Sequence, residues 1–236
     1  MKTLSFHDLK VGRPNQNLLN MDTASQGISF QAGLNLIVAP NGYGKTTLLQ
    51  TLAGVLKPQS GAFKIDDRTV RPEEDALYVS EYLSFPKFIK SSEWIEFIAD
   101  QPWGSAIEGQ LQVKVKGFRL EDKMQNFLGR LSQGERRKVT WLGAFCSKKP
   151  ILLLDEPLDG LDLLSIECAR QILREWKAQG KIVCLIAHQI SELLDLSDQV
   201  FLIKDQKLID WKTVNPTAAS QLPVEKFRTS VLEFYG

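Results

Sequence analysis

The strongest constraint in the sequence is a glycine-containing loop between a strand-like run and a helix-like run. The apolar run Leu34–Ala39 is followed by the loop segment 40–44 and then by a helical pattern that opens with Lys45 and Thr46. A loop in this place lets backbone N–H groups surround a phosphate chain at the positive end of a helix dipole. The pattern therefore predicts a phosphate-binding loop at the end of a buried strand, and with it an α/β fold.

The residue types in this loop have separate expected roles. Its glycines permit close approach of the backbone, Lys45 reaches the β- and γ-phosphates, and the Thr46 hydroxyl ligates Mg²⁺. Ala39 stands where the usual pattern has its first glycine, and its methyl group is tolerated there if its φ is negative. The predicted phosphate-binding residues are Asn41, Gly42, Tyr43, Gly44, Lys45, Thr46 and Thr47.

Further short apolar runs predict the rest of a parallel sheet, because continuous apolar character is typical of strands buried on both faces. These runs are Leu77–Ser80, Ile151–Leu154, Ile182–Ala187 and Val200–Ile203. Between the second and third of them, apolar residues step by three or four and predict the helix of a strand–helix–strand unit. Its apolar positions are Leu161, Leu164, Cys168, Ile172 and Trp176.

One buried run ends in two carboxylates. Asp155 and Glu156 follow Ile151–Leu154 directly, and carboxylates at the end of an apolar strand are costly unless a positive charge lies opposite. Mg²⁺ supplies that charge, so we expect Asp155 to hold the metal and Glu156 to orient and deprotonate an attacking water. The alternative for this pair is an aspartate helix cap beside a solvated glutamate.

Two weaker motifs complete an order along the chain. The segment Leu131-Ser132-Gln133-Gly134-Glu135 has the form of a helix-start turn, and His188 follows the run Ile182–Ala187. With its motifs in this order, the sequence resembles, over residues 34–207, the nucleotide-binding subunit of ATP-binding cassette (ABC) transporters. The resemblance implies a P-loop NTPase sheet core with an inserted helical subdomain, ATP and Mg²⁺ as cofactors, and ATP hydrolysis.

The resemblance also implies roles for single residues. Ser132 and Gly134 are expected to contact the γ-phosphate bound by the opposite subunit of a dimer. His188 is expected to hydrogen-bond the γ-phosphate, and segment 158–162 to link the two sites across the dimer. The expected catalytic residues are therefore Lys45, Glu156 and His188, and the expected metal ligands are Thr46, Asp155 and Glu81.

Besides Ala39, three positions depart from the family pattern. Gln133 replaces a signature glycine, and Glu81 stands where the family commonly has a glutamine that senses Mg²⁺ and water. A carboxylate can approach the metal but cannot donate a hydrogen bond as an amide does. Where the family has an aromatic residue that stacks on adenine, this sequence has Arg13, so Arg13 by its guanidinium plane, or Phe6, is expected to take that role. Glu81 and Gln133 resemble variants of exporter-type ATPases.

We expect one ABC ATPase domain over residues 1–236. Residues 1–91 and 148–210 form its nucleotide-binding α/β core, residues 92–147 form the helical subdomain with the signature motif, and residues 211–236 form a C-terminal extension.

A cluster of aromatic residues follows the run Leu77–Ser80. Its members are Tyr82, Phe85, Phe88, Trp94 and Phe97. In the ABC family this region forms the groove that receives a short helix from a transmembrane subunit, and Lys87 and Lys90 would lie at its rim. The alternative is that these residues only join the two subdomains.

Composition limits the remaining function classes. Lys plus Arg total 29 and Asp plus Glu 28, and this balance argues against general attraction to nucleic acid or anionic lipid, so no nucleic-acid partner is expected. The three cysteines suggest neither a disulfide framework nor a zinc site. No apolar run has the length of a signal peptide core or a membrane span. We therefore expect a cytoplasmic protein, peripheral on the inner face of the cell membrane through its partner.

The preferred interpretation is an ATPase subunit that dimerises around ATP, with itself or with a paralogue, and drives a membrane transporter. One alternative is a soluble ABC ATPase that acts on a protein or nucleic-acid assembly, although the sequence has no basic arm and no long coiled-coil insertion. The other alternative is a degenerate nucleotide-binding module that regulates without turnover, prompted by Ala39, Gln133 and Glu81.

Overall fold

Five parallel strands form one half of the sheet, and each corresponds to a predicted apolar run. They are β4 (Gly33–Val38), β7 (Ala76–Val79), β8 (Ile151–Asp155), β9 (Ile182–Ile186) and β10 (Gln199–Lys204). They pair side by side in the order β10-β4-β9-β8-β7. The computed structural model, which describes residues 2–13, 16–80, 84–100, 108–187, 190–211 and 224–235, thus confirms the predicted parallel sheet.

A mostly antiparallel group of strands continues the sheet beyond β10. It contains β1 (Thr3–Arg13), β2 (Gln16–Met21), β3 (Ser29–Gln31), β5 (Ser60–Ile65), β6 (Arg68–Thr69) and β11 (Lys207–Asp210). The order along the edge is β6-β5-β1-β2-β11-β10, and β3 pairs with β1. The sequence analysis missed β1 because its buried residues, such as Leu4 and Phe6, alternate with more exposed ones and form no continuous apolar run.

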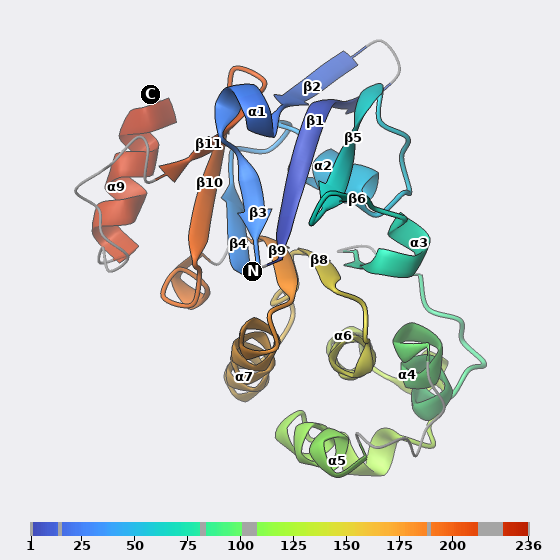
Figure 1. Cartoon of the computed structure of the whole chain (residues 1–236). Coiled ribbons are helices and arrows are strands. Elements are labelled where there is room, and N and C mark those ends of the chain that lie inside the picture. Colours follow the sequence, from blue (N-terminus) through green and yellow to red (C-terminus); the bar gives the residue numbers. More distant parts are fainter. Residues whose placement is uncertain are drawn as a thin grey trace.

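The helices lie in distinct places around this sheet (Figure 1). Helices α4 to α7 lie together at one side of the parallel strands, and α9 lies beside β10. Three of them, α4, α5 and α6, fall between β7 and β8 in the chain, as expected for a helical insertion. The helix bounds are α1 (Thr23–Gln26), α2 (Lys45–Leu52), α3 (Pro72–Asp75), α4 (Ser91–Ala99), α5 (Glu108–Gly117), α6 (Gln133–Cys146), α7 (Leu163–Ala178) and α9 (Val224–Tyr235), with 3₁₀ turns at Glu121–Lys123, Leu128–Arg130 and Ile190–Glu192.

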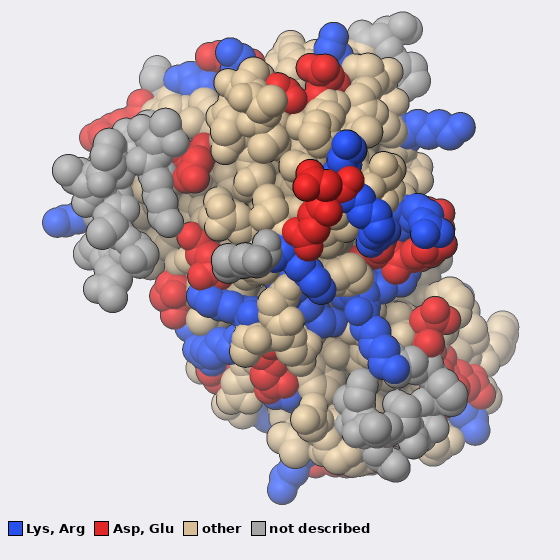
Figure 2. All heavy atoms as spheres, in the orientation of Figure 1, with Lys and Arg blue, Asp and Glu red and all other residues tan. Residues whose placement is uncertain are grey.

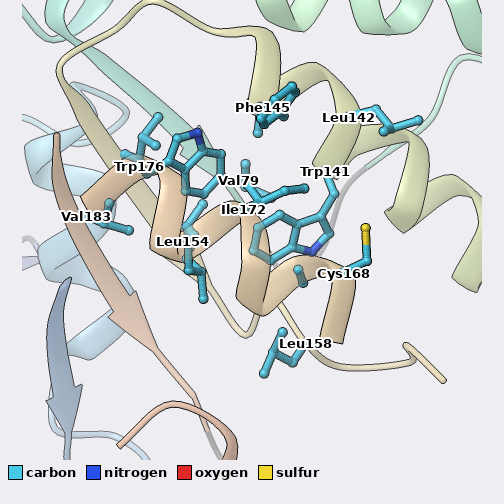
Figure 3. Packing of buried hydrophobic residues seen from close by; sticks show 14 of the residues in the cluster. Val79, Trp141, Leu142, Phe145, Leu154, Leu158, Cys168, Ile172, Trp176 and Val183 are labelled. Atoms are coloured by element: carbon cyan, nitrogen blue, oxygen red, sulfur yellow. The ribbon is translucent and has the colours of Figure 1, made fainter. Parts of the chain in front are cut away.

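The two faces of the parallel strands pack into two different cores. On β8, Leu152 and Leu154 belong to the core shared with α4 to α7, whereas Ile151 and Leu153 belong to the core shared with α2 and the antiparallel strands. In the first core the indole rings of Trp141 and Trp176 stack, with centroids 5.5 Å apart (Figure 3). Helix α2 is therefore enclosed between the two halves of the sheet, which fixes the position of the loop that precedes it.

The crossover helix α7 differs from its predicted pattern at one end. Cys168, Ile172 and Trp176 are buried as predicted, but the side chain of Leu164 is 56% exposed. The buried stripe of α7 begins only at Ser165, because Leu164 lies in the first turn, where no described residue covers it. Leu164 therefore belongs to the helical period of the sequence without facing the core.

Two further observations concern the cysteines and the helices. Cys146, Cys168 and Cys184 are all buried and free of disulfides. Across the described ranges no helix combines the length and the apolar character needed to cross a bilayer.

Truncating Ile172 should measure the contribution of the first core. Ile172→Ala is expected to lower the free energy of unfolding by about 2–5 kcal/mol, because it removes buried methylene groups and leaves a cavity. The matched change Leu164→Ala on the same helix should stay within about 0.5 kcal/mol. Urea unfolding followed by fluorescence measures both, and equal effects of the two variants would contradict the assigned packing of α7.

Candidate functional site

A pocket of about 410 Å³ opens where β4 and β8 end. It brings together residues that are far apart in the sequence, from the loop after β4, from the end of β8 and from β1. Of the predicted site residues, those that line it are Arg13, Asn41, Gly42, Gly44, Lys45, Thr46, Thr47, Asp155 and Glu156. The structure thus places the predicted phosphate loop and the two predicted carboxylates in one site.

The loop has the backbone geometry that close contact with phosphate requires. Gly42 and Gly44 have φ angles of 85° and 94°, which glycine adopts without strain. A Cβ atom on Gly44 would also lie 3.0 Å from the Cβ of Leu18. Ala39 is not in the left-handed region, so its methyl group is compatible with the loop, as expected. Helix α2 starts at Lys45, and no side chain caps it. The backbone N–H groups of its first turn therefore have no side-chain acceptor at the end of the helix that borders the pocket.

The Lys45 ammonium is folded back onto its own loop. Its Nζ donates to the carbonyl oxygens of Ala39 at 2.7 Å and Pro40 at 3.2 Å. Burial lowers the pKa of Lys45, and the negative charges of Glu156 and Asp155 oppose this effect. The positive charge of Lys45 and the two carboxylates therefore interact inside the same pocket.

Asp155 has a hydrogen-bond donor that the sequence analysis did not identify. The Tyr78 hydroxyl donates to Asp155 Oδ2 at 3.2 Å. Burial raises the pKa of Tyr78 to about 12, so the hydroxyl stays protonated and able to donate. The register of β7 against β8 pairs Tyr78 with Leu153, and strand adjacency was the only signal in the sequence that could have indicated this contact.

Glu156 is held in an uncommon backbone conformation. Its φ is 50° and its residue surface is only 4% exposed. The Glu156 N–H donates to the carbonyl of Ile186 at 2.9 Å, and the Glu156 carbonyl accepts from Arg137 Nη1 at 3.4 Å. A left-handed glutamate persists only when its surroundings determine it, and these backbone contacts from β9 and α6 supply that constraint.

Helix α6 binds the whole segment that follows Glu156. Arg137 also donates to the carbonyl of Asp159, and Trp141 Nε1 donates to the carbonyl of Pro157 at 2.9 Å. Lys138 pairs with Asp162 at 2.6 Å, and this hydrogen bond lowers the pKa of the Asp162 carboxyl. None of these α6 side chains was predicted. The partners of Arg137 and Trp141 are backbone carbonyls, which carry no sequence signal.

The signature residues lie at the start of the same helix and outside the pocket. Ser132 caps α6, its hydroxyl accepting from the Glu135 N–H at 3.1 Å while the Glu135 carboxylate accepts from the Ser132 N–H at 2.8 Å. A Cβ on Gly134 would lie 3.0 Å from the carbonyl oxygen of Gly160. Ser132 is exposed, so its hydroxyl is accessible from outside the molecule.

Several other predicted residues have mixed outcomes. Tyr43 does not line the pocket, and its ring packs edge-on against Tyr235 with centroids 5.7 Å apart. Phe6 is fully buried against Phe30, so the interpretation that it stacks on adenine is wrong, whereas Arg13 lines the pocket. Glu81, Tyr82 and His188 lie outside the described residues, and their roles stay predictions.

The aromatic cluster divides into two groups. Phe85 is partly buried against Trp94 at 5.8 Å, and Trp94 Nε1 donates to Thr140 Oγ1 at 3.3 Å. These two residues therefore join the segment after β7 to α4 and α6, as the alternative interpretation holds. Phe88 and Phe97 differ, because they are 88% and 73% exposed.

Comparisons with known proteins agree with this geometry. Residues 28–159 match the family model described as ABC transporter. The chain is 30% identical over 189 residues to the SkfA peptide export ATP-binding protein SkfE of Bacillus subtilis (strain 168), covering 77% of this chain and 78% of that protein. It is 31% identical over 184 residues to the aliphatic sulfonates import ATP-binding protein SsuB of Albidiferax ferrireducens, covering 76% of this chain and 64% of that protein.

The fold is also found among solved structures. The structure titled "Structure of ATP binding subunit of ABC transporter" superposes with a TM-score of 0.81 at 22% identity, over 97% of this chain and 99% of that chain. The likeness confirms the predicted α/β fold with its P-loop NTPase sheet core. The chain therefore belongs to the ABC transporter family, as one of its ATP-binding and ATP-hydrolysing domains.

Proposed function

We propose that this chain binds Mg²⁺ and ATP in the pocket at the ends of β4 and β8, and that hydrolysis there drives a membrane transporter through a transmembrane partner. The observation that carries the proposal is the convergence of Lys45 and Thr46 with Asp155 and Glu156 in one pocket. A loop that wraps phosphate and a carboxylate pair that can hold a metal and a water are the parts that phosphoryl transfer requires.

The residues present fit Mg²⁺. The Thr46 hydroxyl and the Asp155 carboxylate offer the oxygen ligands that this ion prefers, and proteins commonly complete its shell with substrate phosphates and water. Accordingly, no group of three or more histidine, cysteine or acidic side chains forms a closed metal site within the described part of the chain. When bound, the ion would neutralise charge on the phosphate oxygens. Glu81 is proposed as a further ligand.

The chain's own side chains would divide the remaining work. Lys45 exchanges its two carbonyl partners for phosphate oxygens, which form stronger, charge-assisted hydrogen bonds. Glu156 orients the attacking water and accepts its proton, and its fixed backbone aims the carboxylate. His188 is proposed to hydrogen-bond the γ-phosphate, and Arg13 to stack on the adenine ring.

Replacing Glu156 tests the chemical step. Glu156→Gln should retain ATP affinity and lose hydrolysis by ~10²–10⁴-fold, or about 2.7–5.4 kcal/mol of barrier, because the general base is removed. Glu167→Gln, on the exposed part of α7, is the matched control and should change neither quantity. Phosphate release and ATP binding are measured separately. If the wild type with its partner releases no phosphate with Mg²⁺ present, the regulatory-module alternative replaces this proposal.

We also propose a head-to-tail dimer, with a second copy or a paralogue, that encloses ATP between subunits. Ser132 is exposed and lies with Gly134 at the N-terminal end of α6, where amides and the helix dipole attract anions. The pocket of one chain lacks these residues, so a second subunit would bring them to the γ-phosphate from the open side. ATP then forms part of the interface, and loss of the γ-phosphate weakens it.

Size-exclusion chromatography of Glu156→Gln tests the dimer. We expect a monomer without nucleotide and a dimer with ATP, because hydrolysis is slowed and a carboxylate that repels the γ-phosphate is removed. Adding Ser132→Arg should restore the monomer. Ser132→Ala loses the same helix cap, at a cost of about 1 kcal/mol, without adding bulk or charge. A dimer that forms in Ser132→Ala but not in Ser132→Arg would show that destabilisation of α6 is not the cause. A dimer that forms equally with ADP, or that persists with Ser132→Arg, would refute this arrangement.

The transmembrane partner is proposed to bind through the exposed part of the aromatic cluster. Phe88 and Phe97 expose large apolar rings, with Lys87 and Lys90 nearby in the sequence, which suits recognition of a helix. This contact would place the chain in the cytoplasm, peripheral on the inner face of the cell membrane. Exporter-type transport stays a prediction from Glu81 and Gln133, since one relative's name refers to export and another's to import.

A double substitution tests this surface. Phe88→Ser with Phe97→Ser should abolish co-purification with the membrane partner and leave ATP binding nearly unchanged, because neither ring is buried in the core. Val113→Ser, at an exposed position of α5 in the same insertion, is the control. A collapsed melting temperature in the double variant would instead show that these rings stabilise the fold.

We also propose the domain division that the sequence predicts. Residues 1–91 and 148–210 would form the α/β core, residues 92–147 the helical subdomain and residues 211–236 the C-terminal extension. The position of α4 to α6 between β7 and β8 supports it.

On the face drawn in Figure 2, basic and acidic side chains lie among one another. That nucleic acid is not a partner stays a prediction from the balanced charge of the sequence.

A further inference from the structure

The C-terminal helix touches the phosphate loop directly. Tyr235, in the last turn of α9, packs its ring edge-on against the ring of Tyr43, with centroids 5.7 Å apart and an interplanar angle of 88°. Edge-to-face pairs of this kind stabilise a structure by more than the burial of their apolar area alone would. Tyr43 lies between Gly42 and Gly44, so the contact holds the residue between the two loop positions that have positive φ angles.

The Tyr235 hydroxyl enters the sheet at the point where β4 becomes the loop. It accepts a hydrogen bond from the Ile203 N–H at 3.1 Å and lies 2.9 Å from the Ile203 carbonyl oxygen and 3.2 Å from that of Val38. Val38 is the last residue of β4, and the β4–β10 ladder ends at its pairing with Leu202. The hydroxyl therefore continues the ladder by one bridge, immediately before the loop begins.

The rest of α9 is anchored so that Tyr235 stays in place. Phe227 is buried against Trp211, with ring centroids 5.1 Å apart. Lys204 donates to the carbonyl of Phe234 and lies over its ring at 4.8 Å, which also places a positive charge at the negative end of the helix. Figure 1 shows α9 lying beside β10, the strand that carries Lys204.

We propose that Tyr235 is a positioning residue for ATP binding, which acts through Tyr43 and the Val38 carbonyl to hold the phosphate loop in its binding geometry. The inference rests on the assignment of this loop to ATP in the proposed function. A loop that is already ordered loses less conformational entropy when ATP binds, so the contact raises affinity without touching the nucleotide. By linkage, ATP in turn stabilises the docking of α9.

The variant Tyr235→Phe isolates the hydroxyl and keeps the ring against Tyr43. We expect its Kd for ATP to rise about twofold to tenfold, the range of one net hydrogen bond. Leu232→Ala, at an exposed position of the same helix, is the matched control and should leave the Kd unchanged. Binding is measured by calorimetry on the full chain carrying Glu156→Gln, and the melting temperature of each variant is recorded without nucleotide.

A double-substitution cycle isolates the ring contact. Tyr43→Ala and Tyr235→Ala should each weaken ATP binding, and together they should weaken it by less than the product of the two effects, because either one removes the same contact. Tyr43→Phe keeps the ring and should restore the affinity lost in Tyr43→Ala. In hydrogen exchange, ATP should slow the Ile203 amide in the background protein and slow it less in Tyr235→Phe.

Distinct outcomes separate this inference from the proposed function. If Tyr235→Phe melts earlier but binds ATP as its parent does, the contact is only structural and the inference is wrong. Independent effects of Tyr43→Ala and Tyr235→Ala, or tighter ATP binding in Tyr235→Phe, would also overturn it. Failure of the parent protein itself to bind ATP would overturn the proposed function, and this inference with it.

Discussion

The opposition of Lys45 to Asp155 and Glu156 is the interaction on which the rest of the site depends. All three residues are buried, and an isolated buried charge is costly, so each needs the opposite charge across the pocket. The sheet satisfies this need by placing β4 and β8 in one parallel set, with β9 between them, so that both strands deliver their charges at the same end. Tyr78 then partners Asp155, and the loop carbonyls of Ala39 and Pro40 hold the Lys45 ammonium.

Much of the parallel half of the fold could be predicted because its strands are continuous apolar runs that end in recognisable motifs. Leu34–Ala39 before the loop and Ile151–Leu154 before Asp155 each combine both signals. Strand β1 carries neither signal. Its buried residues alternate with more exposed ones, and such a pattern is also compatible with a surface strand in another fold. Leu164 fits the helical period without facing the core, because the period indicates a face but not where along the helix another element covers it.

The side chains that hold the site could not be predicted for a different reason. Tyr78 lies 77 residues from Asp155, and Tyr235 lies 197 residues from Val38. Arg137 and Trp141 donate to backbone carbonyls, which every residue possesses. Such contacts follow from the tertiary arrangement alone. Lys45 and Glu156, in contrast, belong to local sequence patterns that indicate a chemical role.

Two helices approach the site from different parts of the chain and act on different halves of it. Helix α9 contacts the phosphate loop through Tyr43 and Val38, so under the proposed function its influence would fall on nucleotide binding. Helix α6 holds the backbone of Glu156 and the following segment through Arg137 and Trp141, so its influence would fall on the position of the proposed base. Because α6 also begins at Ser132, one helix carries both the exposed Ser132 and the side chain that contacts the Glu156 backbone. Under the proposed function, binding and chemistry would thus be supported by separate helices, which would let one be altered without the other.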